Sequence, residues 1–277
     1  MNGNCNYHGM AQQNGGIIDT VRRHVAELVN PEVVYLLGLG ESSRRTESLF
    51  TTTSARMSTV SHCYLLVLVE KKDDEFTLNC LQDKIETHLG KFIGATVIVL
   101  TLYSFNSWLQ EGHRFARVVK ERAVCLYMRE GLVLPEAKEP DAEKQKTENE
   151  KLVKETQVRV KEFLAGADLF LVRKQNEMAA FMLHQAAEQA LRTFMIVHTG
   201  YRFNCHSIDR LVRCCSMFCY RLPDIFPKTN EKSKRVFGLL KDAYIGSRYK
   251  KDYAVGDEDL AVMMEKVKGL VGLVFSF

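Results

Sequence analysis

Long apolar runs are missing from this sequence of 277 residues. Its longest apolar stretches, at 64–69 and 95–100, are as long as a β-strand and far shorter than the roughly 20 residues that a membrane-spanning helix needs. The opening residues 1–16 are rich in Asn, Gln and Gly and contain no apolar core of a secretory signal. We therefore expect a cytoplasmic protein with a flexible tail over 1–16 and no membrane partner.

Neither sign of charge dominates the sequence. The chain has 38 Lys and Arg against 34 Asp and Glu, which gives a formal net charge of +4. A balance this mild does not by itself require nucleic acid or a lipid surface as a partner, and we expect no DNA partner. The 46% of apolar residues and 26% of charged residues are ordinary for a globular protein.

Paired cysteine motifs are also absent. The eight cysteines include no CxxC pair and are scattered through apolar stretches, so we expect free, buried thiols. The densest group is Cys214, Cys215 and Cys219, with Cys205 and His206 upstream. Its spacing matches no zinc pattern, and the residues between its members look like core. We expect no metal site and no cofactor.

A charged stretch divides the chain. Acidic residues and lysines dominate 136–151, which is typical of a solvated linker. The sequence therefore predicts one domain over 17–134, a charged linker over 135–150 and a second domain over 151–277.

Thr147 and Glu150 have the spacing of a capping box. This pattern predicts that a helix begins inside the linker, at Thr147.

The first domain alternates between two kinds of hydrophobic pattern. Apolar residues at a helical period alternate with β-rich apolar runs, which predicts an α+β domain with a small mixed sheet. The polar stretch 41–59 is predicted to be a loop or a short helix. The predicted helices are 17–29, 76–89 and 105–120, and the predicted strands are 33–39, 62–69, 95–102 and 123–128.

The second domain contains no convincing strand pattern. Apolar residues recur at helical spacing throughout, which predicts an all-α up-and-down helix bundle. The predicted helices are 150–173, 179–197, 208–220, 234–245 and 257–274. Met178, Met182, Met195 and Ile196 lie off the main apolar stripe, so we expect a homodimer formed through this domain.

The segments 35–38 (YLLG) and 61–67 (SHCYLLV) form a strand, a glycine turn, a polar stretch and a second strand. In order and spacing, 17–134 resembles the minimal nucleotidyltransferase fold of the polymerase-β type. The resemblance implies a Gly-Ser pair, which falls on Leu39-Gly40 or on Ser42, and a third carboxylate on the strand 95–102; this chain has neither.

The resemblance also places the family's two metal-binding aspartates at His62 and Tyr64. Two-metal phosphoryl transfer needs carboxylate oxygens to hold Mg²⁺, and imidazole and phenol are poor ligands for that ion. We therefore expect a catalytically inactive domain. The alternative is a rebuilt site that uses Glu41, Glu47 or Glu70.

Three segments of the second domain resemble HEPN domains. The segment 178–192 (MAAFMLHQAAEQALR) is similar to the signature helix of that family, 206–211 (HSIDRL) to its next helix start and 242–249 (DAYIGSRY) to a late functional segment. Many HEPN domains are metal-independent ribonucleases with an Arg followed four to six residues later by a His. Here no His follows Arg248, so no imidazole in that segment can transfer a proton.

The resemblance therefore points to the sacsin-like, nucleotide-binding branch of the family. It makes Arg248, Tyr249, Lys250 and Lys251 the candidate nucleotide-binding residues, with no catalytic residue. Two alternatives stay open, namely that Arg248 caps its helix or that it pairs with Glu188.

Two histidines in this domain have structural interpretations. We expect His184 to be a hydrogen-bond partner between helices, and His206 to be structural at the start of a helix.

Three functions follow from these observations. The first is a protein that binds a nucleotide or another phosphate ligand without catalysis. The second is an active nucleotidyltransferase of the antibiotic-modifying type, and the third is a HEPN ribonuclease toxin. The residues at 62, 64 and 249–254 favour the first.

Overall fold

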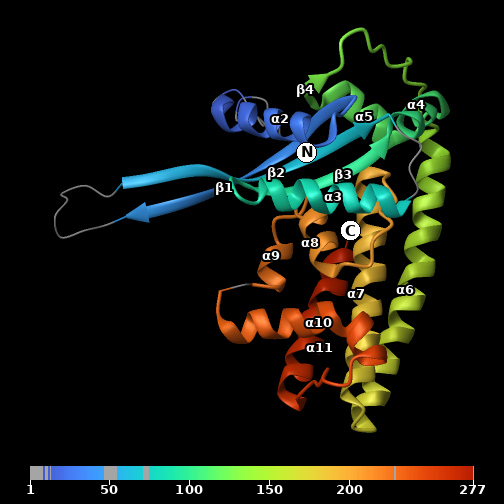
Figure 1. The fold of residues 1–277 in the computed structure, drawn as a ribbon. Coiled ribbons are helices and arrows are strands. Elements are labelled where there is room, and N and C mark those ends of the chain that lie inside the picture. The colour runs from blue at the N-terminus through green and yellow to red at the C-terminus, as the bar shows by residue number, and fades with distance from the viewer. Residues whose placement is uncertain are drawn as a thin grey trace. The chain divides into compact units, whose positions relative to one another are not determined.

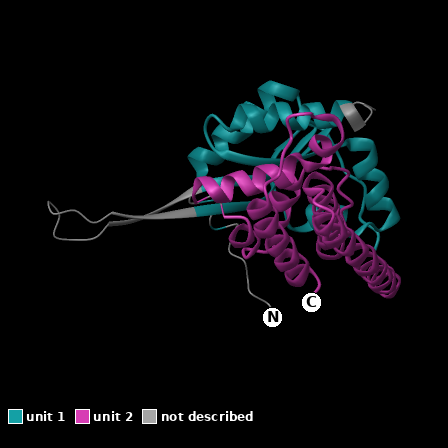
Figure 2. Ribbon diagram, turned by 90° about the horizontal axis from the view of Figure 1, so that it is seen from below, with its two compact units in different colours: residues 1–140 teal, residues 141–277 magenta. Residues whose placement is uncertain are grey.

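The computed structural model describes residues 9, 12, 14–46, 55–70, 75–227 and 229–276. The chain divides into two compact units, Met1–Pro140 and Asp141–Phe277 (Figure 2). Among the residues described, no helix is both long enough and apolar enough to cross a membrane.

The first unit is built on a four-stranded sheet with the order β3-β2-β1-β4 (Figure 1). Strand β1 (Val33–Thr46) pairs antiparallel with β2 (Ala55–Val69) and with β4 (Val124–Met128). Strand β3 (Gly94–Thr101) runs parallel to β2. The predicted small mixed sheet is confirmed.

Helices cover both faces of this sheet. Helices α2 (Gly15–Val29) and α3 (Glu75–Leu89) pack on one face, where alternate strand residues form an apolar core. Helix α4 (Leu102–Glu111) contacts β2 and β3, and α5 (Arg114–Arg122) packs against α4. Since side chains alternate across a strand, a sheet covered on both faces needs nearly continuous apolar strands. This is the pattern seen at 64–69.

The polar stretch after the first buried strand is not a loop or a short helix. Backbone pairing between β1 and β2 continues from Glu41↔Val60 to Thr46↔Ala55, past the last pairs of β3 and β4. The prediction for 41–59 is therefore wrong over 41–46 and 55–59, while 47–54 lies outside the described residues. Backbone hydrogen bonds between β1 and β2 hold this ribbon together. It does not depend on apolar residues, so its sequence lacks the alternation from which a strand is predicted.

The predicted helix 105–120 is two helices with a break at Gly112. This glycine has a φ of 75°, in the left-handed region that favours glycine. A Cβ on Gly112 would lie 2.9 Å from the carbonyl oxygen of Glu139. The turn therefore lets the segment before the second unit run close against the end of α4.

We expect Gly112→Ala to destabilise the protein more than Gly131→Ala. Both glycines have positive φ, 75° and 76°, and a left-handed conformation costs an L-residue about 1–2 kcal/mol. Only at Gly112 would the added Cβ also meet backbone, since no atom lies within 4 Å of the Cβ position at Gly131. Chemical denaturation measures both losses. Equal losses would contradict a close approach at Gly112.

The second unit is helical, as predicted (Figure 1). Helix α7 is its centre and contacts α6, α8, α10 and α11. Its small buried residues Ala179, Ala186, Ala187 and Ala190 let the neighbouring helices approach closely. The helices are α6 (Ala142–Val172), α7 (Asn176–Thr199), α8 (Ile208–Cys215), α9 (Leu222–Ile225), α10 (Glu231–Tyr249) and α11 (Asp257–Val274).

Several helix ends differ from the prediction. Helix α6 begins at Ala142, where the Asp141 side chain accepts a hydrogen bond from the Lys144 N–H at 2.9 Å. The predicted start at Thr147 is wrong, and residues 142–150 of the predicted linker are helical. Helix α8 ends at Cys215, well before residue 220. Helix α10 continues to Tyr249, which places the candidate residue Arg248 in its last turn.

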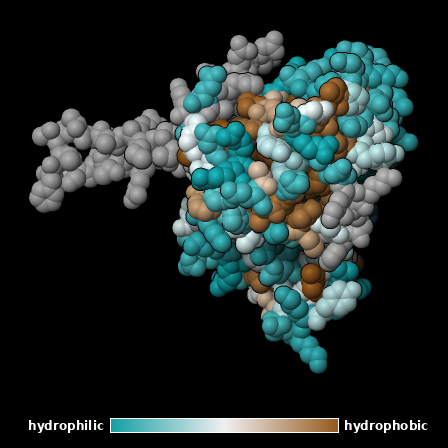
Figure 3. All heavy atoms as spheres, turned by 45° about the horizontal axis from the view of Figure 1, so that its top comes forward, coloured by the Kyte–Doolittle hydropathy of each residue, from teal (hydrophilic) through white to brown (hydrophobic). Residues whose placement is uncertain are grey.

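The apolar residues expected at a dimer surface differ in exposure. Met195 is completely buried within the unit, so its assignment to a surface is wrong. Met178 and Met182 are half-buried, and Val158, Leu169 and Val172 on α6 are exposed. Figure 3 shows that hydrophobic residues also gather near the middle of one face, surrounded by hydrophilic ones.

Candidate functional site

A buried carboxylate organises the polar centre of the second unit. Glu188 on α7 is 1% exposed. Its Oε1 atom lies 3.0 Å from Nη1 of Arg192 and 3.0 Å from Nδ1 of His206. Its Oε2 atom lies 3.5 Å from Nε2 of His184, which is longer than a well-formed hydrogen bond. One acidic side chain thus faces three basic side chains.

Helical spacing and tertiary packing place these groups together. His184, Glu188 and Arg192 follow one another at intervals of four on α7, so they share a face. This face is polar, yet His184 and Glu188 are buried in it. The reason is that α10 covers it: Nδ1 of His184 lies 2.9 Å from the carbonyl oxygen of Leu240. The prediction that His184 is a hydrogen-bond partner between helices fits this contact.

The charge state of Glu188 follows from its neighbours. Burial raises the pKa of the Glu188 carboxyl, but nearby His184, the charge of His206 and the hydrogen bond from Arg192 together lower the pKa by more than burial raises it. The net result is a pKa below the ordinary value. Glu188 is therefore an ionised carboxylate at neutral pH, and such a group only accepts hydrogen bonds.

Tyr244 on α10 joins this centre to the surface. The His206 ring stacks on the Tyr244 ring, with centroids 5.0 Å apart and planes at 9°. The guanidinium carbon of Arg248 lies 4.4 Å from the centroid of the same ring. It also lies 5.2 Å from the ring of Phe181 and 5.1 Å from the ring of Tyr249. We name Glu188, His206, Tyr244 and Arg248 the Tyr244 cluster.

Arg248 is held against its own helix. Its Nε and Nη2 donate hydrogen bonds of 2.9 and 2.7 Å to the carbonyl oxygen of Tyr244. The alternative that Arg248 caps its helix therefore matches the structure, since a cation favours the negative end of the helix dipole. The alternative pairing with Glu188 does not, because Arg192 and His206 pair with that carboxylate.

The other candidate residues lie beside Arg248 but outside this contact network. Tyr249 is 74% exposed and ends α10, and Lys250 is the C-cap residue. Lys250 and Lys251 are exposed. Within the described ranges, neither lysine forms an ion pair.

Sequence reasoning missed His206 and Tyr244 as members of the site. The ribonuclease pattern has its imidazole after the arginine, whereas His206 lies 42 positions before Arg248 and contacts the same aromatic ring. One local signal was available for Tyr244. Residues four apart on a helix are neighbours, so an Arg at 248 predicts contact with residue 244.

His62 and Tyr64, the positions at which the resemblance implied metal-binding aspartates, contact each other, and His62 also contacts β3. Nε2 of His62 lies 2.8 Å from Oγ1 of Thr96, and the rings of His62 and Tyr64 are 4.8 Å apart. Glu41 pairs near the beginning of β2, whereas Glu70 follows its end, so the fold does not bring these two carboxylates together. Glu47 lies outside the described residues. In the described part of the chain, no group of three or more potential metal ligands comes together.

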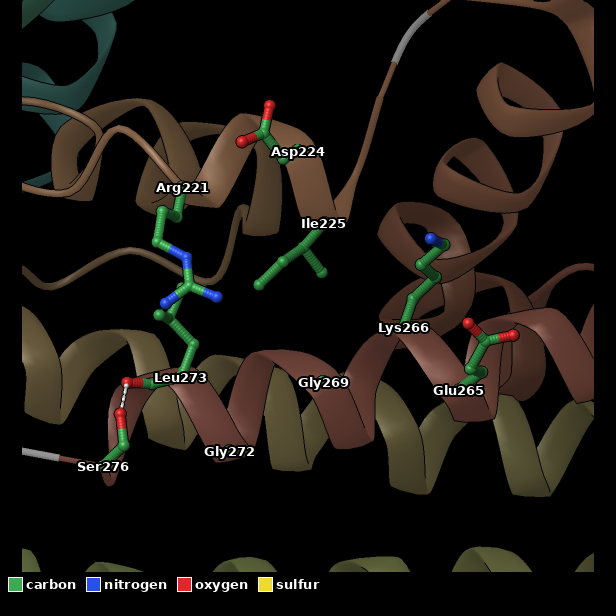
Figure 4. A pocket seen from close by; sticks show the side chains of 9 residues that line it. All are labelled: Arg221, Asp224, Ile225, Glu265, Lys266, Gly269, Gly272, Leu273 and Ser276. Carbon is green, nitrogen blue, oxygen red and sulfur yellow. Dashed lines mark hydrogen bonds between the residues drawn. The ribbon is translucent and has the colours of Figure 1, made fainter.

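A separate hollow of about 480 Å³ lies between α9 and α11 (Figure 4). In Figure 4, Arg221 and Ile225 extend from α9 toward α11, and Gly269 and Gly272 leave the α11 side open. The hollow is also lined by the acidic Asp224 and Glu265 and by the basic Lys266. Since both signs of charge line it, it favours no single charge of ligand, and we assign it none.

Comparison with known families adds one finding to this geometry. Residues 158–275 match the family model of the HEPN domain. No curated protein matches the chain. A HEPN domain is therefore present in the second unit, and it contains the complete Tyr244 cluster.

Proposed function

We propose that the HEPN domain binds a nucleotide or another phosphate ligand without catalysis. The binding residues in this proposal are Arg248, Tyr249, Lys250 and Lys251. The observation that carries it is the exposed guanidinium of Arg248, which lies over the Tyr244 ring and donates two hydrogen bonds to one carbonyl oxygen.

A fixed guanidinium is suited to phosphate. Its planar set of N–H groups can hold two phosphate oxygens, and fixing the plane beforehand reduces the entropy lost on binding. Lys250 and Lys251 add positive potential next to it. The exposed ring of Tyr249 offers a surface on which a base can stack. The three cations also offset the negative end of α10, which would otherwise repel an anion.

Thermal denaturation tests this proposal. We expect ATP, GTP or inorganic phosphate to raise the midpoint of unfolding, because a ligand that binds only the folded state stabilises it. The rise should persist in EDTA, since a guanidinium needs no metal ion to hold phosphate. A midpoint unchanged by all three ligands, at millimolar concentrations and with or without Mg²⁺, would contradict the proposal.

We also propose that the N-terminal unit is a nucleotidyltransferase-like domain that lacks catalysis. The support is the pair His62 and Tyr64, which stand where the resemblance places metal-binding aspartates and which contact each other. We expect no transfer of label from α-labelled ATP to any small-molecule acceptor. Incorporation of label that EDTA abolishes would contradict this prediction.

A homodimer through the helical unit is the last part of the proposal. Its support is the row of exposed apolar residues Val158, Leu169 and Val172 on α6, together with the half-buried Met178 and Met182 on α7. A twofold pairing is the common way to cover such a surface. Light scattering of the full chain should give the mass of a dimer. A monomer mass at every protein concentration would contradict it.

A further inference from the structure

Glu188 determines which nitrogen of His206 carries the proton. Nδ1 of His206 lies 3.0 Å from Oε1 of Glu188, and an ionised carboxylate accepts but does not donate hydrogen bonds. Nδ1 must therefore be the protonated nitrogen. In the neutral imidazole, Nε2 then carries a lone pair and no hydrogen.

Arg192 supplies a counter-charge to Glu188 beside His206. Arg192 donates to the same carboxylate oxygen at 3.0 Å and thereby balances its charge. The other nitrogen of the Arg192 fork, Nη2, donates to Oδ1 of Asn204 at 3.2 Å. His184 faces the second carboxylate oxygen from the buried side. Arg192 thus balances the charge of Glu188, and the Glu188 carboxylate accepts a hydrogen bond from His206.

The ring of His206 is partly open to solvent. The side chain of His206 is 57% exposed, whereas that of Glu188 is 2% exposed. Stacking on Tyr244 fixes the plane of the ring, and the bond to Glu188 fixes its rotation. In the described part of the chain, no protein group forms a hydrogen bond with Nε2. The cluster therefore presents a rigid acceptor at the surface.

We infer that Nε2 of His206 accepts a hydrogen bond from a hydroxyl group of the bound ligand, so that the site selects ribonucleotides over their deoxy counterparts. This inference rests on the proposed binding of phosphate at Arg248. His206 is then a specificity-determining residue, and Glu188 is the positioning residue behind it.

The geometry allows one ligand to reach both groups. The His206 ring and the Arg248 guanidinium each lie within 5.0 Å of the centroid of Tyr244, so their separation cannot exceed twice that distance. A nucleotide carries its phosphate and its ribose hydroxyls only a few bonds apart. A hydroxyl is a donor that suits a bare ring nitrogen, whereas a phosphate oxygen would be repelled by it.

Ribose selectivity is measured by titrating the full-length protein calorimetrically in EDTA. The ligands are ATP and GTP, with their 2′-deoxy, 3′-deoxy and 2′,3′-dideoxy forms. We expect the dideoxy form to bind about three- to tenfold more weakly than the ribonucleotide, as for one lost neutral hydrogen bond. The two monodeoxy forms show which hydroxyl is recognised.

Three variants separate the inference from a general loss of binding. His206→Phe keeps a ring that can stack on Tyr244 and removes both nitrogens, so it should bind ribo and dideoxy forms equally. His198→Phe is the matched control, because His198 stacks on Phe218 and lies outside the cluster; it should keep the preference. Arg248→Ala should weaken the binding of all the nucleotides by the same factor.

The outcomes distinguish the two proposals. Binding that depends on Arg248 but not on the ribose hydroxyls would overturn the inference and leave the proposed function standing. A preference that survives in His206→Phe would also overturn it. If no nucleotide binds, the proposed function fails and the inference fails with it.

A ligand-free measurement tests the inference without any variant. The ¹⁵N shifts of the His206 ring report which nitrogen carries the proton, and we expect the Nδ1–H form at neutral pH. The Nε2–H form would overturn the inference even if nucleotides bind.

Discussion

Replacing Glu188 by alanine should lower the free energy of unfolding by about 3–5 kcal/mol, which is the cost of removing one partner from a buried ion pair. Glu188 is 1% exposed and lies within 3.0–3.5 Å of three basic side chains. Without it, the completely buried His184 faces a cavity, and Arg192 and His206 lose their shared acceptor. Urea denaturation followed by circular dichroism measures the loss.

The matched control for this prediction is Glu155→Ala. Glu155 is also helical and lies 3.9 Å from Lys151, but both side chains are more than half exposed. Exposed pairs of this kind contribute about 0–1 kcal/mol. A loss for Glu188→Ala no larger than that of the control would contradict a buried charge centre in the HEPN domain.

The same carboxylate predicts a dependence of stability on pH. Because the pKa of Glu188 is lowered in the folded protein, the carboxylate stabilises the fold above the ordinary carboxyl pKa. This contribution is lost as the pH falls below 4.5, the ordinary value, and through the folded pKa. The stability difference between the native protein and Glu188→Gln should therefore shrink in that acidic range. A difference that grows with acidity would contradict the lowered pKa.

Replacing Arg248 by alanine should weaken the binding of ATP or inorganic phosphate about ten- to a hundredfold. This is the loss of a charge-assisted contact worth about 1.5–3 kcal/mol. Lys241→Ala is the control, since Lys241 is another exposed cation on α10 and its only ion pair among the described residues is with Asp242, at 3.8 Å. Calorimetric titration measures both affinities.

Circular dichroism must show that the Arg248→Ala variant remains folded. A folded variant with unchanged affinity would mean that Arg248 only closes its helix. If the variant unfolds, Lys251→Ala tests the same phosphate surface, because Lys251 is exposed and supports no packing.

Local patterns were enough to predict the helical unit. Apolar residues at helical spacing predicted α7, and Gly200 ends it in a left-handed conformation with a φ of 81°. Glu188 and Arg192 are four residues apart on this helix, a spacing that favours an ion pair, and they form one at 3.0 Å. These features depend on residues within one or two turns of each other, so the sequence contains them directly.

The candidate site depends on packing between distant segments. The contact of Glu188 with His206 joins residues 18 positions apart, and the stacking of His206 on Tyr244 joins α10 to the segment before α8. No periodicity encodes either contact. Charged side chains are mostly exposed in proteins, but histidine and arginine partners allow the charged Glu188 to be buried. Burial therefore could not be predicted from polarity alone.

The central claim is that phosphate binds at Arg248, and NMR of the arginine side chains tests it most directly. In protein labelled with ¹⁵N-arginine, the Nε–H signal of each arginine is assigned from its Lys variant and followed as inorganic phosphate and then ATP are added. We expect the Arg248 signal to shift and saturate with each ligand, while the signal of Arg235, which pairs with Asp259 on α11, stays in place. Saturating shifts at other arginines with an unmoved Arg248 signal would contradict the claim.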